Sequence, residues 1–391
     1  MSKIVDGLRL AARSAPESGI VEVITAARDV EHLIPLWVGE GDLPTPAFIC
    51  EAAKRSLDDG ETFYTYQRGI PELREALAGY HSGLYGRDFS SKRFFVTGSG
   101  MQAIQIAVQC VAGSGDEVIY PSPAWPNLAA AVEIIGAKAV PVAMDSTDSG
   151  WTLDIEKLFA AVTPRTKALF LNSPCNPTGW VAEESVLRNI LDEARKRDLW
   201  IIADEVYGRF CYGAGGQAPS FYDFCDDEDK ILFVNTFSKN WAMTGWRVGW
   251  ISVPPVMGQV VENLIQYSTS GVPVFSQRAA LAAMTEGRRF LDEQIKRAEY
   301  GRQIVLEGLG QDSRIHLSAP DGAFYLFFGV DGFEDSRQLA LDLVRGAGVG
   351  LAPGSAFGKA GEGYLRLCYA RSAAHLEEAV ERIVGWLNAA K

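Results

Sequence analysis

Short apolar runs alternate with helix-like stretches through the middle of the chain. The runs that predict strands lie at 94–97, 117–121, 167–172, 199–205, 231–237 and 248–253. Helical patterns follow the first three of them, over about 100–111, 127–135 and 182–197. Because the runs are continuously apolar, they are typical of parallel strands buried on both faces. The pattern therefore predicts an α/β fold whose large domain has a mainly parallel sheet sandwiched by helices.

The pattern changes on both sides of this region. Upstream, Pro71 opens a helical stretch that Gly86 ends. Downstream of about residue 290, a charged helix leads into apolar runs and two further helical patterns. This order predicts a smaller α+β domain, and residues 1–40 are too few to form a core alone. We expect both chain ends to build that domain, with 1–45 as N-terminal arm and part of it, 46–288 as the large domain and 289–391 as the rest of the small domain.

Composition narrows the class of function without naming it. The 391 residues carry 37 basic and 49 acidic side chains, a net charge of −12. Nucleic-acid binders usually show a basic patch or stripe, so this balance argues against that class. No stretch reaches the roughly 20 apolar residues of a membrane span, and the N-terminus lacks the apolar core of a secretory signal. We expect a cytoplasmic protein without nucleic-acid or membrane partners.

The cysteines are scattered along the chain. They stand at Cys50, Cys110, Cys175, Cys211, Cys225 and Cys368, and no two form a C-x-x-C pair. This spacing predicts neither a metal site nor a disulfide framework, and it agrees with a reducing compartment.

A glycine-containing turn at 98–100 joins the run at 94–97 to a helical pattern. Backbone N–H groups at such a helix N-terminus suit a phosphate. The string also satisfies the G-x-G-x-x-A pattern of nicotinamide dinucleotide folds. Those folds need an acidic residue at the end of the next strand, where this chain has Tyr-Pro-Ser at 120–122. The nicotinamide interpretation therefore fails, and a phosphate site or a plain strand–helix turn remains.

Two further motifs follow apolar runs. Asn176 lies in NSPCNPTGW, a turn in which Pro177 fixes φ and Gly179 permits a positive φ. Asp204 ends an apolar run, and Tyr207 lies three residues beyond it. A buried carboxylate needs a cationic or hydrogen-bonding partner. Taken alone, the first motif also fits an ordinary loop, and the second also fits an acid that caps the next turn.

The fourth motif centres on Lys239, just beyond the run at 231–237. A lysine among apolar residues has a lowered pKa and becomes a usable nucleophile toward a carbonyl. Thr236 and Ser238 flank it with hydroxyls, and Arg247 follows. Most single lysines are solvated surface residues, but this context favours a site. Together the motifs supply a phosphate cradle, an amine, a buried acid, hydrogen-bonding side chains and a cation, the set that pyridoxal 5′-phosphate requires.

With these motifs in place, the chain resembles a class I/II aminotransferase of the aspartate aminotransferase superfamily, the fold-type-I pyridoxal phosphate enzymes. The resemblance spans essentially the whole chain, in the family order: GEGDLPTP, YTYQRGIPELREAL, GSGMQA, PSPAWP, NSPCNPTG, DEVY, SKNWAMTGWRVGW, DGAFY, PGSAFG and YLRLCYA. It implies a transaminase that moves an amino group from an L-amino acid to a 2-oxo acid by a ping-pong mechanism. It also implies a homodimer with shared active sites.

The resemblance implies a role for each catalytic position. Lys239 matches the lysine that holds the cofactor as a Schiff base and then shuttles a proton between the substrate Cα and the cofactor C4′. Asp204 matches the acid that pairs with the pyridinium nitrogen. Asn176 and Tyr207 match the pair that hydrogen-bonds the ring oxygen. Trp125, in PSPAWP, matches the aromatic residue that stacks on the ring.

Binding positions are implied in the same way. The phosphate site is matched by the backbone of Ser99, Gly100 and Met101 and by the side chains of Thr236, Ser238 and Arg247. Tyr64 matches a tyrosine that reaches the phosphate of the neighbouring subunit. Arg366 matches the arginine that forks onto the substrate α-carboxylate, and Gly39 and Asn176 complete that substrate-binding set.

Two departures from the family pattern bear on the substrate. Met101 stands where the bacterial aspartate-specific branch carries a lysine, and GEGDL replaces GEPDF. A second carboxylate on the substrate calls for a cation, whereas Met101 offers an apolar surface. Arg68 is the nearby cation that can substitute, unless it is a solvated loop residue. We therefore expect that aspartate is not the best donor, although the sequence does not name the donor.

Two alternatives share the scaffold. One is a carbon–sulfur β-lyase, although NSPCNPTG and DEVY fit transaminases better. The other is a non-catalytic pyridoxal-binding regulator, but the segment before Gly39 shows no helix-turn-helix pattern. Release of pyruvate and ammonia without an oxo-acid acceptor distinguishes the lyase.

Overall fold

Seven strands form one large sheet in the computed structural model, which describes residues 3–147, 149–213 and 216–389. In sheet order they are β2 (Phe94–Thr97), β10 (Gly249–Ser252), β9 (Ile231–Thr236), β8 (Trp200–Asp204), β7 (Thr166–Asn172), β3 (Glu117–Ser122) and β4 (Lys138–Ala143). The five strands from β9 to β4 run parallel, and β10 is antiparallel to both of its neighbours. The prediction of a mainly parallel sheet is confirmed.

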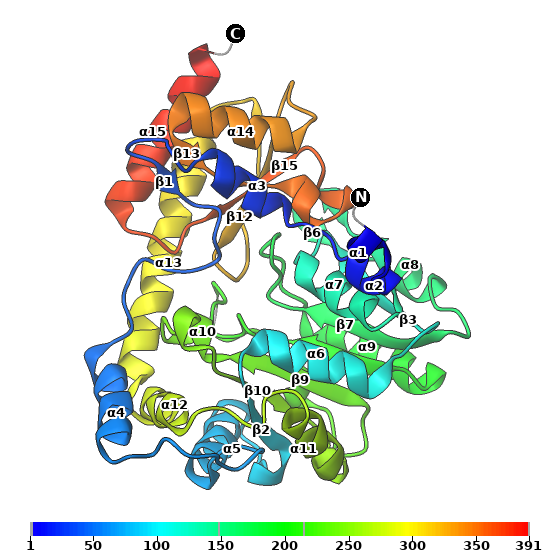
Figure 1. Cartoon of the computed structure of the whole chain (residues 1–391). Coiled ribbons are helices and arrows are strands. Elements are labelled where there is room, and N and C mark those ends of the chain that lie inside the picture. The colour runs from blue at the N-terminus through cyan, green and yellow to red at the C-terminus, as the bar shows by residue number, and fades with distance from the viewer. Residues whose placement is uncertain (1–2, 148, 214–215, 390–391) are drawn as a thin grey trace.

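Helices cover both faces of this sheet (Figure 1). One face packs against α6 (Gly100–Val111), α7 (Pro126–Ile134) and α11 (Gly258–Gln266). The other packs against α8 (Ile155–Ala160), α9 (Glu184–Arg197), α5 (Pro71–Tyr85), α12 (Val274–Glu286) and α4 (Ala47–Asp58). Successive strand residues point to opposite faces, so Ile202 lies in the first core and Ile201 in the second. Burial on both sides is the reason that the strand runs are continuously apolar.

Two strands differ from the sequence pattern. The pattern predicts no strand at 138–143, yet these residues form β4 at the edge of the sheet. Pro141 interrupts the apolar pattern there, and an edge position tolerates proline because one side of the strand needs no partner. The run at 248–253 contains β10, which pairs antiparallel with β9 after the connection formed by residues 237–248. That connection carries Lys239.

A smaller unit lies above the large sheet in Figure 1 and uses both chain ends. Its antiparallel sheet has the order β11 (Ile315–His316), β12 (Tyr325–Val330), β15 (Tyr364–Cys368) and β14 (Ala352–Pro353). The helices of its core are α3 (Gly19–Ala26), α13 (Arg288–Leu309), α14 (Ser336–Ala347) and α15 (Ala373–Ala389). Near the N-terminus, β1 (Ile34–Pro35) pairs in parallel with β13 (Val349–Gly350). The prediction of a smaller α+β domain built from both ends is confirmed.

Apart from short 3-10 helices, the remaining elements connect these two parts or lie at their edges. They are α1 (Lys3–Asp6), α2 (Leu10–Arg13), β5 (Asp145–Thr147), β6 (Gly150–Thr152) and α10 (Phe237–Asn240). The guanidinium of Arg9 donates to the carbonyl of Ile134, which holds the N-terminal segment beside α7. Within the described part of the chain, no helix combines the length and apolarity that a membrane span requires.

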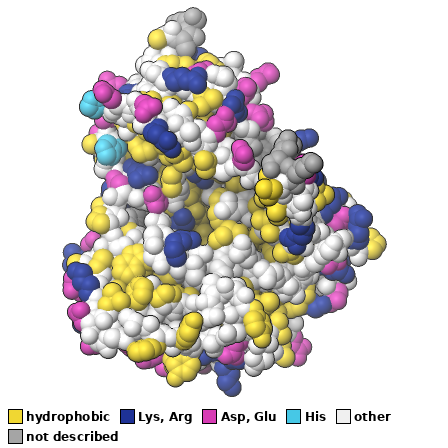
Figure 2. All heavy atoms as spheres, viewed as in Figure 1, with side chains coloured by type: hydrophobic (Ala, Val, Ile, Leu, Met, Phe, Trp, Pro, Cys, Tyr) yellow, Lys and Arg dark blue, Asp and Glu magenta, His cyan; other side chains and the backbone are white. Residues whose placement is uncertain are grey.

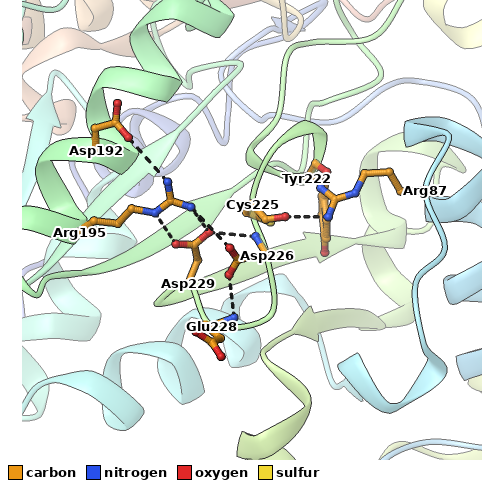
Figure 3. A network of polar contacts seen from close by, with 8 residues as sticks. All are labelled: Arg87, Asp192, Arg195, Tyr222, Cys225, Asp226, Glu228 and Asp229. Atoms are coloured by element: carbon orange, nitrogen blue, oxygen red, sulfur yellow. Dashed lines mark hydrogen bonds and ion pairs between the residues drawn. The ribbon is translucent and has the colours of Figure 1, made fainter.

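Two arginines hold the loop that leads into β9 (Figure 3). Arg195, on α9, forms a two-pronged contact with Asp229, with both N–O distances at 2.7 Å. From the other side, Arg87 donates to the carbonyls of Tyr222 and Cys225 at 2.8 Å each. Paired hydrogen bonds of this kind fix orientation as well as position. The loop therefore sets where β9 begins, and β9 carries the candidate site residues at its other end.

Candidate active site

A cavity of about 440 Å³ lies between the carboxyl ends of the large sheet and the smaller unit. Figure 2 shows this face of the molecule hollowed between its upper and lower parts, with apolar side chains around the hollow. The carboxyl ends of parallel strands are the usual place for ligands in open α/β sheets. The cavity lining comes from α3, the segment at 37–40, α6, the ends of β8 and β9, β12 and β15. It therefore draws on both parts of the fold.

Most of the residues singled out from the sequence meet at this cavity. They are Gly39, Gly100, Met101, Trp125, Asn176, Asp204, Tyr207, Thr236, Ser238, Lys239, Arg247 and Arg366. Ser99 lies just behind the lining, where its hydroxyl accepts a 3.1 Å hydrogen bond from the Gln102 N–H and caps α6. Tyr64 lies elsewhere: it is 93% exposed and borders a separate groove of about 450 Å³.

Lys239 lies on α10, directly after β9. Its ammonium donates a 2.7 Å hydrogen bond to the Gly39 carbonyl and lies 5.8 Å from the centre of the Tyr207 ring. Burial lowers the pKa of Lys239 to about 8, because a buried ammonium loses its hydration. Its apolar sequence neighbours Phe237 and Trp241 pack into the core below instead of facing the cavity. Of this short helix, only Ser238 and Lys239 line the cavity.

Asp204 ends β8 and is only 3% exposed. Its carboxylate accepts a long hydrogen bond, 3.3 Å, from the Val206 N–H. Burial raises the pKa of Asp204 to about 7, while the Val206 N–H and the charge of Lys239 act in the opposite direction. One weak donor leaves much of the acceptor capacity of a carboxylate unused. The group therefore suits a ligand that presents a positively charged N–H inside the cavity.

Asn172 was missed in the sequence and belongs to the same edge. It ends β7 and lies in register with Asp204 of β8. Its side chain donates to the Asp204 carbonyl at 3.1 Å and accepts from the Asn176 N–H at 2.8 Å. It thereby ties the turn that carries Asn176 to the strand that carries Asp204. Its position as the polar last residue of an apolar run was the available signal.

Arg366, on β15, brings the smaller unit to the site. Its guanidinium donates to the Asn176 side-chain oxygen at 2.8 Å and to the Trp37 carbonyl. The guanidinium carbon lies 4.5 Å from the Tyr325 ring centre and 4.8 Å from that of Phe357. Aromatic faces attract a guanidinium and fix its plane. A buried, oriented guanidinium of this kind suits a planar carboxylate.

Tyr325 is a second site residue without a sequence prediction. Its hydroxyl shares a 2.7 Å hydrogen bond with the hydroxyl of Tyr207, so it links β12 to the segment after β8. A Cβ placed on Gly39 would lie 2.0 Å from the same hydroxyl. Only glycine therefore fits position 39 while the Tyr207–Tyr325 pair is intact. In the sequence, Tyr325 reads as one more apolar residue of a buried strand.

The opposite end of the cavity is built to receive an anion. Gly100 begins α6, a helix of 12 residues whose first backbone N–H groups have no partner within the helix. Thr236 lies directly beside Gly100, and its hydroxyl donates to that of Ser238 at 2.9 Å. Arg247 is exposed at the rim, and its guanidinium donates to the Thr244 carbonyl at 2.7 Å. Hydroxyls, N–H groups and a guanidinium together suit a phosphate.

Gly249 on β10 supports this anion site from behind. A Cβ there would lie 2.7 Å from the Asn235 carbonyl oxygen and 2.8 Å from the Gly100 nitrogen. Replacing Gly249 with alanine should therefore push the start of α6 away from β9 and cost roughly 1–3 kcal/mol of stability. Gly245→Ala is the matched control, because nothing lies within 4 Å of its Cβ position. Urea unfolding and phosphate titration of both variants check this, and equal effects at the two positions would contradict it.

Arg68 corrects one alternative taken from the sequence. It is neither a cavity cation nor a solvated loop residue. Its guanidinium pairs with Glu262 at 2.7 Å and lies 5.5 Å from the centre of the Phe95 ring. The arginine is half-buried, and the cavity lining does not include it. Arg68 therefore holds α11 against the sheet and lies outside the cavity of its own chain.

Known proteins of one family resemble this chain over nearly its whole length. The sequence model of the family described as aminotransferase class I and II matches residues 31–383. A protein of Methanocaldococcus jannaschii named probable aspartate aminotransferase is 32% identical over 369 residues, which cover 93% of this chain and 95% of that protein. The solved aspartate aminotransferase of Thermotoga maritima superposes with a TM-score of 0.91 at 33% identity, covering 97% of this chain and all of that one (100%). The solved aromatic aminotransferase of Pyrococcus horikoshii gives 0.86 at 34% identity, covering 94% and 99%.

Proposed function

The chain belongs to the class I and II aminotransferase family and is a transaminase, and we propose that it uses pyridoxal 5′-phosphate to move an amino group from an L-amino acid to a 2-oxo acid. One observation carries the proposal. Lys239 and Asp204 line the same cavity, the lysine with a pKa lowered to about 8 by burial and the acid buried with acceptor capacity to spare. An amine nucleophile and an acid for a ring nitrogen are the two groups that this cofactor needs most.

The residues present fit the cofactor at each of its ends. The N-terminus of α6 with Thr236, Ser238 and Arg247 suits the phosphate, and Asp204 suits the ring nitrogen. Trp125 is an aromatic residue of the lining that is available to stack on the ring. When bound, pyridoxal phosphate supplies an electron sink that withdraws electrons from the substrate α-carbon. The negative charge of Asp204 keeps the ring nitrogen protonated, which the sink requires.

Lys239 has two tasks in this proposal. As a neutral amine it would hold the cofactor covalently, and the lowered pKa increases the neutral fraction near pH 8. With substrate bound, the Lys239 amine would take the proton from the substrate α-carbon, acting first as general base and then as general acid. The alternating use of one site by donor and acceptor is what makes the kinetics ping-pong. Asn176 and Tyr207 face the same cavity and are proposed to bind the ring oxygen.

Arg366 orients the substrate for this proton transfer. We assign the α-carboxylate to its guanidinium, with the Asn176 side chain and the Gly39 backbone beside it. The flanking rings of Tyr325 and Phe357 keep the fork in one plane. A two-point contact fixes the substrate about its Cα, and such orientation supplies much of the rate enhancement in enzymes.

The direct test combines spectroscopy with chemical trapping. Protein purified with pyridoxal phosphate should show the visible band of a protonated Schiff base, and borohydride should abolish it. Peptide mass spectrometry should then find the reduced cofactor on Lys239. Modification of another lysine, or no modification, would overturn the assignment. An amino acid alone should yield one oxo acid per site, whereas continuous release of pyruvate and ammonia would indicate a lyase instead.

We also propose a homodimer in which Tyr64 completes the site of the neighbouring subunit. Tyr64 is 93% exposed and Phe63 beside it 84%, and both border the groove formed by 61–65 and 269–275. Aromatic side chains gathered at one exposed place are typical of protein–protein contacts.

The six free cysteines agree with a reducing cytoplasm as the working compartment.

Mixing two inactive variants tests the shared site. Lys239→Ala refolded together with Tyr64→Ala should regain part of the wild-type activity, because one site of the mixed dimer then receives an intact lysine and an intact tyrosine. Lys239→Ala refolded with Arg247→Ala is the matched control, since both lesions fall on the chain's own side of the site and no intact site forms. Sedimentation gives the oligomeric state, and a fully active monomer would contradict the proposal.

A further inference from the structure

In the proposed function, every basic side chain that lines the cavity already has a role other than binding the substrate side chain. Among the described residues that line it, the positively charged ones are Lys239, Arg247 and Arg366. In the proposed function, on which this inference rests, they serve the cofactor, its phosphate and the substrate α-carboxylate. The acids of the lining, Glu40 and Asp204, add negative charge instead. A second carboxylate on the substrate would therefore find no unassigned cation among the described residues that line the cavity.

The rest of the lining is largely apolar and comes from the N-terminal part of the chain. Helix α3 contributes Ile20 and Val21, and the segment after β1 contributes Trp37 and Val38. Val21 is 57% exposed and Val38 36%, although large aliphatic side chains are usually buried. Across the cavity, α6 contributes Met101. Apolar surface that remains exposed around a ligand cavity is available for apolar parts of the ligand.

Both the charges and the apolar lining of the cavity therefore favour an uncharged, apolar substrate side chain. Removing a carboxylate from water without a cationic partner is strongly unfavourable, and a negatively charged neighbour such as Glu40 adds repulsion. An aliphatic, aromatic or thioether side chain loses nothing there and gains by covering Val21 and Val38. Arg68, the other arginine considered, is paired with Glu262 away from the cavity.

We propose that this transaminase selects amino donors whose side chains are uncharged and apolar, and that Val21 and Met101 form the surface that selects them. Because donor and acceptor use one site in turn, the preferred 2-oxo acids also lack a second carboxylate. Aspartate, glutamate and their oxo acids are then the poor substrates.

Half-reactions of the holoenzyme test the selection without a coupled acceptor. The cofactor band is followed in stopped-flow mixing with leucine, phenylalanine or methionine and, separately, with aspartate or glutamate. At least one apolar donor should react with a second-order rate constant at least tenfold above that of either acidic donor. Equal or faster reaction of aspartate would overturn the inference while leaving the proposed transaminase intact. If no amino acid changes the band, the proposed function itself fails.

Paired lysine variants test the selecting surface. Val21→Lys and Met101→Lys place an ammonium at the cavity and should raise the ratio of aspartate to leucine rates at least threefold. Ile24→Lys is the matched control: it adds the same charge to α3, at a residue that is 37% exposed and outside the cavity lining, and should leave the ratio unchanged. If neither cavity variant shifts the ratio beyond that of Ile24→Lys, this assignment of the selecting surface is wrong.

Binding provides a readout independent of turnover. Isothermal titration of the holoenzyme compares 3-phenylpropanoate with succinate, which resemble an aromatic and an acidic donor without the amino group. We expect 3-phenylpropanoate to bind at least tenfold more tightly, and Val21→Lys to narrow the difference. Tighter binding of succinate to the wild type would overturn the inference.

Discussion

Replacing Lys239 with alanine should reduce transaminase turnover on the order of a millionfold, the scale seen when a catalytic unit is removed. In the proposed function the variant loses the amine that would hold the cofactor and carry the proton, and no second lysine of the described chain lines the cavity. Steady-state assays and the visible spectrum check this result. Pyridoxal phosphate should still bind through the N-terminus of α6 and the hydroxyls of Thr236 and Ser238, but without the Schiff-base band.

A surface lysine supplies the control for this variant. Lys230 pairs with Asp198 at 2.5 Å on the outside of the protein, far from the cavity lining. Lys230→Ala should keep wild-type turnover and the wild-type spectrum. Near-normal activity or an intact band in Lys239→Ala would contradict the assignment of the site.

The second large effect is expected at Asp204, where activity and stability should move in opposite directions. Asp204→Asn should lower turnover roughly a hundred- to a thousandfold, as loss of one preorganised electrostatic partner commonly does. The amide keeps the shape of the carboxylate but cannot hold a proton on the ring nitrogen by charge. Asp204→Glu should be milder because it keeps the charge. Wild-type activity in the asparagine variant would exclude the proposed role.

The same substitution should stabilise the cofactor-free protein at neutral and alkaline pH. Burial raises the pKa of Asp204 from 3.8 to about 7, so the folded state binds a proton that the unfolded state releases between these values. The contribution of this group to stability is thus fully present below about pH 4 and is lost as the pH rises through about 7. The loss corresponds to roughly 4 kcal/mol at most.

Urea unfolding at several pH values separates the contribution of protonated Asp204 from that of ionised Asp204. Without cofactor, Asp204→Asn should be more stable than the wild type at pH 8, with the difference vanishing near pH 4. Excess pyridoxal phosphate should reduce the stability difference between the two proteins, because the protonated ring nitrogen of the bound cofactor would pair with the wild-type carboxylate. A wild type that is the more stable protein at pH 8 without cofactor would show that the carboxylate is already satisfied by the chain.

Sequence reasoning reached the part of the site that lies at the ends of the large sheet. Asp204 ends one apolar run, Asn176 follows a second, and Lys239 lies just beyond a third. In a parallel sheet such ends converge at one edge, so residues distant in the chain can be grouped without coordinates. The antiparallel return of β10 did not disturb this grouping, because the connection after β9 stays at the same edge.

The residues contributed by the smaller unit were harder to find. Tyr325 lies in an apolar run that predicts only a buried strand, and its bond to Tyr207 depends on how the two parts pack. Arg366 was found through family resemblance and not through its own pattern. Ile20 and Val21 lie on a short helix whose partner is far away in the sequence. Contacts across such distances are set by packing, which a local pattern does not encode.

The use of both chain ends has a consequence for the order in which a newly made protein acquires its parts. On the ribosome, the strands of the large sheet and Lys239 emerge well before β13, the partner that β1 needs for pairing. Arg366 follows Lys239 by 127 residues, an interval of roughly 6–25 s at about 5–20 residues per second. During that interval the nascent chain can contain the proposed cofactor site around Lys239 but lacks Arg366, the proposed site for the substrate α-carboxylate. The proposed cofactor can therefore bind before the substrate site is complete. A chain truncated before β15 is expected to bind pyridoxal phosphate but not to transfer an amino group.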